Sequence, residues 1–146
     1  MIDPDVRPAG SDDAEQLQVL EAEARASVAD RRGGPRWLAT HPPREATWSD
    51  SVDGRNVLVA HIAAVVVGYL VLVVDPPLAT VAEVYVTPPA RELGFGDALL
   101  EAAIDRARHE GCSVLEGESL PGDRDTKNLY ERAGIKARLI TVSTEI

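Results

Sequence analysis

Residues 83–100 read EVYVTPPARELGFGDALL, and they say more about the architecture than any other part of the chain. A segment of alternating β-branched and aromatic residues ends at a double proline, which does not continue a strand. Gly94 and Gly96 follow, and an apolar pattern with helical spacing begins directly after them. The pattern predicts a strand that leads through a glycine turn into the N-terminus of a helix.

The glycine turn is a candidate anion site. The first N–H groups of a helix have no carbonyl partner, and the helix dipole adds positive potential at this end. Glycine also lets the backbone approach a phosphate closely, so a diphosphate would fit here. Taken alone, however, the glycine pair favours an ordinary helix start.

A dinucleotide-binding fold is the first alternative to consider. Gly94 and Gly96 precede a helix, and Glu116 follows about 20 residues later, as a ribose-binding acid would. Leu99 stands where that motif has its third glycine, and the double proline puts too many residues between the strand and the glycines. Both observations argue against this fold.

The flanking sequence predicts further elements on both sides of this stretch. We expect strands at 4–8, 56–62, 65–74, 79–87, 113–120 and 135–146, and helices at 11–30, 93–110 and 123–133. Residues 31–55 should be irregular or form short helices, because Pro and Gly interrupt them. This order predicts an α/β sandwich with a mixed sheet.

The two longer helices have recognisable ends. Asp12 and Glu15 give the first helix a start that resembles a capping box. Gly111 is placed to stop the second helix at its C-terminus.

One segment could belong either to a membrane or to a sheet. Residues 57–74 are nearly all apolar over 18 positions, which is about the length that spans a bilayer. They are rich in valine and carry His61 near the middle, and β-branched side chains favour strands over helices. We therefore expect a hairpin turning at Ala63-Ala64, although this dipeptide lacks the glycine that two-residue turns prefer.

The amino-acid composition limits the kinds of molecule that the chain is expected to bind. The chain has 146 residues, the size of one domain over 1–146, and a net charge of −9. This charge argues against nucleic acid and anionic membranes and favours cationic partners. Cys112 is the single cysteine, and no Cys and His cluster has metal-ligand spacing, so we expect no metal and a reducing, cytoplasmic location.

Two motifs together resemble the GCN5-related N-acetyltransferase (GNAT) family. Residues 91–96, RELGFG, match its hallmark of Arg or Gln, two residues, Gly, one residue, then Gly or Ala. Residues 128–135, NLYERAGI, are similar to a second signature, a Leu-Tyr-Glu-Arg run that ends in Gly-Phe. The resemblance implies a mostly antiparallel, twisted mixed sheet flanked by helices. In it, the strands at 79–87 and 113–120 would splay apart.

The resemblance implies acetyl-CoA as the acetyl donor, with no metal. The thioester would sit between the splayed strands. Asp123 stands where the family usually has Asn, which brings a negative charge near the cofactor. The pyrophosphate would lie on Arg91, Glu92, Leu93, Gly94, Phe95 and Gly96, and the pantetheine arm along Val84, Tyr85 and Val86.

The resemblance also implies that a small-molecule or peptide amine attacks directly in a ternary complex. An amine with a lysine-like pKa of about 10.4 must first lose a proton. Glu118 matches the position of a base in the family's ribosomal-protein N-terminal acetyltransferases, and Glu83 lies on the facing strand; each is equally compatible with a solvated strand-end charge. Tyr130 matches the family's general acid toward the departing sulfur, or it is a packed helix residue.

Several alternatives stay open at this point. The family sets its acceptor through the region corresponding to 31–55, where Trp37 and Trp48 could wall a pocket or lie in a core. A catalytically silent acyl-CoA sensor or interaction module is the alternative to an enzyme, and a longer acyl donor is another. The tail after Ile135 is shorter than the family's usual pair of final strands, so a homodimer partner could supply a missing strand.

Overall fold

The computed structural model describes residues 3–44, 48 and 56–146. Its strands form one sheet in the order β1-β2-β3-β4-β5, in which the first four pair antiparallel and β4 pairs with β5 in parallel. The expected mixed, mostly antiparallel sheet is confirmed. The strands are β1 (Asp5–Pro8), β2 (Asn56–Ile62), β3 (Val65–Asp75), β4 (Leu78–Val86) and β5 (Val114–Gly117), and the α-helices are α1 (Ala14–Val28), α2 (Gly34–Thr40), α4 (Phe95–His109) and α5 (Arg124–Arg132).

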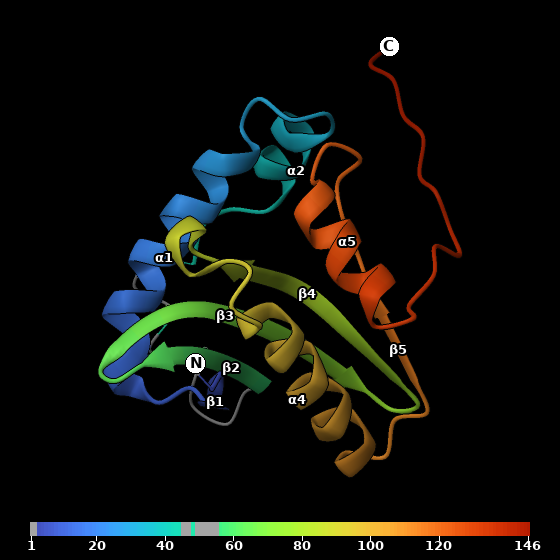
Figure 1. Ribbon diagram of the computed structural model, residues 1–146. Coiled ribbons are helices and arrows are strands. Elements are labelled where there is room, and N and C mark those ends of the chain that lie inside the picture. The colour runs from blue at the N-terminus through green and yellow to red at the C-terminus, as the bar shows by residue number, and fades with distance from the viewer. Residues whose placement is uncertain (1–2, 45–47, 49–55) are drawn as a thin grey trace.

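Helices cover both faces of the sheet (Figure 1). On one face, Leu17 and Leu20 of α1 pack in a buried cluster with Trp48 and Tyr69. On the other face, α4 and α5 contribute to a second and larger cluster. Because side chains alternate along a strand, a sheet covered on both faces needs apolar residues at nearly every position. This explains why residues 57–74 are continuously apolar.

The predicted hairpin is confirmed. β2 and β3 are joined at Ala63 and Ala64, and Ala63 has the left-handed φ of +51° that the tight turn requires. No helix among residues 3–44, 48 and 56–146 has the length and apolar character needed to cross a bilayer.

The start of the first helix differs from the prediction. Asp12 and Glu15 do not form its cap; a short 3-10 helix, Ser11–Asp13, precedes α1 instead. The carboxylate of Asp13 accepts hydrogen bonds from the backbone N–H of Gly10 (2.8 Å) and from both terminal nitrogens of Arg7 (2.7 and 2.8 Å). Asp13 therefore ties β1 to α1, and this tie lies one residue beyond the predicted cap.

Glycines mark both ends of the long helix α4. α4 begins at Phe95, because Gly94 before it has a left-handed φ of +88°. Gly111, with φ of +85°, ends the helix as predicted.

The final predicted strand is wrong. Residues 135–146 form no regular element and run away from the sheet (Figure 1). Their β-branched composition favours a strand, but strand propensity is realised only where a neighbouring strand supplies hydrogen bonds. Four large apolar side chains of this tail are at least 80% exposed: Leu139, Ile140, Val142 and Ile146.

The region 31–55 is partly described. The short helix α2 is present, with Pro35 in its first turn, as the predicted pattern of interrupted helices allows. The predictions for residues 45–47 and 49–55 lie outside the described residues.

We expect Asp13→Asn to lower the free energy of unfolding by about 1–2 kcal/mol at pH 7, because charge-assisted hydrogen bonds from Arg7 are weakened. The hydrogen bond from Arg7 lowers the pKa of Asp13. The carboxylate's contribution is therefore present above its unfolded-state pKa and is lost as the pH falls through its lower folded-state pKa. Urea unfolding at pH 7 and at about pH 2 measures this.

Asp12→Asn is the matched control, because Asp12 is a neighbouring but exposed carboxylate. It should unfold like the wild type at both pH values. A destabilisation of Asp13→Asn that persisted at the lower pH would show that packing, not charge, is responsible.

Candidate functional site

The two parallel strands, β4 and β5, diverge after a short paired stretch. β5 pairs with β4 only from Leu78↔Val114 to Val81↔Gly117, whereas β4 continues to Val86. Figure 1 shows the two strands diverging from their paired ends. The expected splay is confirmed, and one edge of β4 is left open beyond Val81.

The backbone at this open edge can be assigned by alternation. The N–H of Thr87 donates to the carbonyl of Val67 on β3 (2.8 Å). Every second residue of β4, counted back from Thr87, therefore directs its backbone N–H and C=O groups toward β3. The carbonyl of Val86 instead accepts a hydrogen bond from Nε of Arg91 (2.9 Å) on the open side. Val84 lies two positions before Val86, so the backbone groups of both residues point to the open edge. Such an edge can pair with another extended chain.

The turn after β4 carries unusual backbone geometry. Glu92 has a left-handed φ of +66°, which is uncommon for a residue with a side chain. The N–H of Ala98 donates to the carbonyl of Gly94 (3.0 Å). The N–H groups of residues 95–97 come before this first i→i−4 donor and have no partner within the helix, so they form the donor-rich end of α4.

The open edge, this turn and the start of α5 line one cavity of about 510 Å³. Leu93 lies outside its lining and is 42% exposed. The other predicted cofactor-binding residues all line the cavity: Val84, Tyr85, Val86, Arg91, Glu92, Gly94, Phe95, Gly96 and Asp123.

Tyr85 and Arg91 are stacked at the edge of this cavity. The guanidinium of Arg91 lies 5.5 Å from the centre of the Tyr85 ring. Burial and the nearby Glu23 carboxylate raise the pKa of Tyr85 to about 12, so its phenol stays protonated.

Asp123 caps a helix in this structure. Its carboxylate accepts from the N–H (3.3 Å) and the hydroxyl (2.7 Å) of Thr126, which fixes the start of α5. Arg31 lies 3.7 Å from the same carboxylate. The Asp123 carboxylate, which the sequence analysis expects near the cofactor, is thus engaged in a helix cap and an ion pair.

Tyr130 lies where β4 and β5 separate. Its hydroxyl is buried and has no hydrogen-bond partner among the described residues. Burial, followed by the charges of Glu118 and Asp123, raises the pKa of Tyr130 well above its usual value, so the phenol keeps its proton. Buried hydroxyls nearly always have a partner, so this unpaired donor is unusual. Tyr130 itself is not among the lining residues of the cavity described above.

Gly117 is a positioning residue that the sequence analysis missed. A Cβ at this position would lie 2.3 Å from Oη and 2.4 Å from Cζ of Tyr130. The Tyr130 ring can occupy its place only because Gly117 has no side chain. A glycine within a strand pattern is the signal that could have revealed this close approach.

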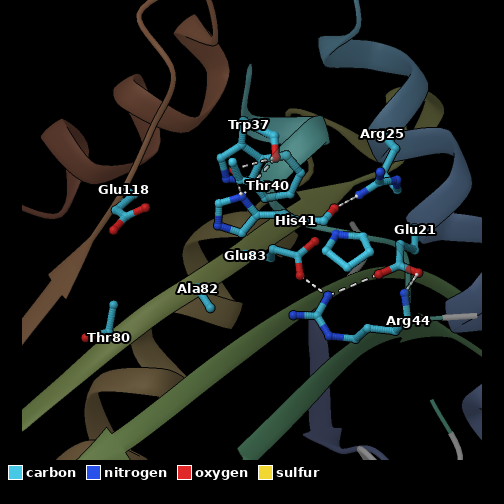
Figure 2. Close-up of a pocket in the computed structure, with 11 residues that line it drawn as sticks. Glu21, Arg25, Trp37, Thr40, His41, Arg44, Thr80, Ala82, Glu83 and Glu118 are labelled. Carbon is cyan, nitrogen blue, oxygen red and sulfur yellow. Dashed lines mark hydrogen bonds and ion pairs between the residues drawn. The ribbon is translucent and has the colours of Figure 1, made fainter. Parts of the chain in front are cut away.

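A second cavity, of about 330 Å³, brings the two predicted bases together. Glu83 on β4 and Glu118 just beyond β5 both line it (Figure 2). Trp37 of α2 lines it as well, whereas Trp48 is fully buried in the core. The two tryptophans therefore take the two different roles that the sequence left open.

The two carboxylates differ in environment. Glu83 forms an ion pair with Arg44 and accepts a hydrogen bond from the hydroxyl of Tyr69 (3.4 Å). Burial raises the pKa of Glu83, and the positive charge of Arg44 opposes that shift. Glu118 is exposed and has no ion-pair partner among the described residues.

Sequence analysis also missed Glu21 and Arg44. Glu21 lies on the apolar face of α1 and is only 2% exposed, where it accepts a hydrogen bond from Nε1 of Trp48 (3.2 Å). An acidic residue at a core position of an amphipathic helix is the signal that could have marked it. The described residues contain no group of three side chains able to hold a metal ion.

Comparison with known proteins gives a consistent result. The sequence profile described as the acetyltransferase (GNAT) family matches residues 16–135. Among curated proteins, none matches the chain.

Three solved structures that share this fold are each less than 25% identical to this chain. A mutant protein from Bacillus halodurans is 19% identical, with a TM-score of 0.80 over 100% of this chain and 99% of its own. The ribosomal-protein-alanine N-acetyltransferase of Brucella melitensis biovar Abortus 2308 is 21% identical, with a TM-score of 0.71 over 99% and 98%. An aminoglycoside N-acetyltransferase in complex with CoA is 14% identical, with a TM-score of 0.70 over 97% and 100%.

We expect Gly117→Ala to lower the free energy of unfolding by about 1–3 kcal/mol, because the new methyl group overlaps the Tyr130 ring. Urea unfolding measures the change. Gly10→Ala is the matched control, since nothing lies within 4 Å of a Cβ there, and it should shift stability by less than about 0.5 kcal/mol. Equal stability of the two variants would show that the ring is not held against Gly117.

Proposed function

This chain belongs to the acetyltransferase (GNAT) family, and we propose that it transfers an acetyl group from acetyl-CoA to a primary amine by direct attack in a ternary complex. One observation carries this proposal. The hydroxyl of Tyr130 is a buried donor with no partner among the described residues, and it lies where β4 and β5 part.

The residues around the 510 Å³ cavity fit a CoA molecule. Val84 and Val86 offer backbone groups to an extended amide-containing arm, as one strand does to another. The turn at residues 91–96 and the start of α4 offer N–H donors to a diphosphate. When bound, acetyl-CoA supplies the activated acyl group, and the backbone N–H of Val86 would donate to the acyl oxygen.

Proton removal from the acceptor is assigned to Glu118. An amine with a pKa of about 10.4 is almost fully charged at pH 7, so a carboxylate must both attract it and accept its proton, directly or through water. Glu83 lines the same cavity but is engaged by Arg44 and Tyr69. Glu118 is the carboxylate open to an incoming ammonium group, and Glu83 has a secondary role.

Tyr130 acts as a hydrogen-bond donor to the departing sulfur. Its raised pKa means that the phenol remains protonated at any ordinary pH. A thiolate with a pKa of about 8.5 is a much weaker base than this phenolate. Donation of a hydrogen bond, without full proton transfer, is therefore the role that the environment of Tyr130 supports.

We expect Tyr130→Phe to lower kcat about 100-fold, near the lower end for a general acid, with little change in the affinity for acetyl-CoA. Only the hydroxyl is lost, and the ring still packs against Gly117. Release of free thiol with a panel of amines measures turnover, and titration calorimetry measures CoA binding. Ser113→Ala, which removes an exposed hydroxyl outside both cavities, should stay close to the wild type.

Two results would change this assignment. Wild-type turnover of Tyr130→Phe with a good amine would leave Tyr130 as a packing residue. Binding of acetyl-CoA without thiol release for any amine in the panel would favour a catalytically silent acyl-CoA sensor with the same fold.

We expect Glu118→Gln to lower the rate more at pH 7 than at about pH 10, where much of the amine is already neutral. Glu83→Gln is the matched variant on the facing strand, and it should show a smaller and less pH-dependent loss. The pH profile of kcat/KM measures both. A loss that is uniform across pH in Glu118→Gln would assign Glu118 to acceptor binding only.

A further inference from the structure

The cavity that holds the two predicted bases already contains a cation. The guanidinium of Arg44 lies between the carboxylates of Glu21 and Glu83 (Figure 2). Its Nη1 is 3.0 Å from Oε2 of Glu21 and also contacts Oε2 of Glu83, and the backbone N–H of Arg44 donates to Oε1 of Glu21 (2.8 Å). The dicarboxylate formed by Glu21 and Glu83 is thus occupied by a group of the chain itself.

Arg44 is held firmly in this place. Its guanidinium lies 5.1 Å from the centre of the buried Trp48 ring, so an aromatic face adds to the two carboxylates. The side chains of Glu21 and Glu83 are 3% and 12% exposed, whereas that of Arg44 is 28% exposed. The guanidinium therefore forms the cavity wall in front of the two acids.

The charges of the lining leave room for one further positive charge. Three carboxylates line the cavity, those of Glu21, Glu83 and Glu118, together with the guanidinium groups of Arg25 and Arg44. Arg25 donates to the backbone carbonyls of residues 38 and 41, so its positive charge stays at the cavity wall. Arg25 and Arg44 offset two of the three negative charges, and Glu118 is the exposed carboxylate of the three, so it is the one that an entering ammonium group meets.

We propose that Arg44 determines the class of acceptor: a primary amine with a single positive charge, in preference to a diamine or polyamine. This inference rests on the proposed acetyl transfer. A first ammonium group is attracted by Glu118. A second ammonium group on the same molecule cannot pair with the Glu21 and Glu83 carboxylates, because Arg44 already contacts both. Arg44 and Arg25 also repel it.

Hexylamine and 1,6-diaminohexane test this directly, because they differ by one ammonium group on the same carbon chain. Binding of each to the full chain with CoA present is measured by calorimetry, and acetylation is measured by thiol release from acetyl-CoA. The wild type should bind the diamine no more than about twofold more tightly, the advantage of having two equivalent ends. Arg44→Gln should raise the ratio of diamine to monoamine affinity about tenfold or more, the effect of one charge-assisted contact.

Two controls separate charge from general disturbance. Arg44→Lys keeps the positive charge and should keep the wild-type ratio. Arg36→Gln removes an exposed arginine from α2 outside the cavity lining and should also keep it. Circular dichroism checks the fold of each variant, and if Arg44→Gln does not fold, the wild-type ratio alone still tests the proposal.

The outcomes for the inference and for the proposed function are distinct. An unchanged ratio in folded Arg44→Gln, a wild type that binds the diamine tenfold more tightly, or a wild type that does not bind hexylamine would overturn the role of Arg44. Binding with the expected ratio but no thiol release would support the role of Arg44 and contradict the proposed transfer. Thiol release in which the wild type acetylates the diamine tenfold or more efficiently than hexylamine would support the transfer and contradict the role of Arg44.

Discussion

The separation of β4 from β5 after Val81 and Gly117 is the constraint on which both cavities depend. β5 is paired with β4 along its whole length, and the two chains diverge beyond Gly117. Here the Tyr130 ring fills the place that a side chain at position 117 would take, so α5 packs directly on the end of β5. Beyond this point β4 continues to Val86 without a partner on this side, which leaves the edge at Val84 and Val86 open.

The same separation divides the chemistry between two cavities. The larger one collects backbone donors from the edge of β4 and from the start of α4, while its three arginines each face a carboxylate. Arg31 pairs with Asp123, Arg91 with Asp125 and Arg132 with Asp97. Because these partially exposed charges are already paired, we infer that backbone N–H groups contribute more than arginine side chains to any phosphate binding here.

Local patterns predicted the fold where local physics decides the outcome. The glycine turn at Gly94, the hairpin at Ala63-Ala64 and the helix end at Gly111 follow from short-range geometry, and all three are present. The tail after Ile135 failed because a strand needs a neighbour, and a neighbour cannot be read from composition. The cap at Asp13 was missed because its partner, Arg7, comes from a different element.

Prediction of the candidate site from the sequence is limited in the same way, because contacts between distant residues decide its properties. Motifs pointed to Glu83, Glu118 and Tyr130, but only tertiary structure places Arg44 beside Glu83 and leaves Glu118 facing the cavity. Two acids that look equivalent in the sequence are therefore unequal in the folded chain: Glu83 is paired with an internal cation, and Glu118 has no ion-pair partner among the described residues. A difference of this kind comes from a contact between residues about 40 positions apart, the ion pair from Arg44 to Glu83.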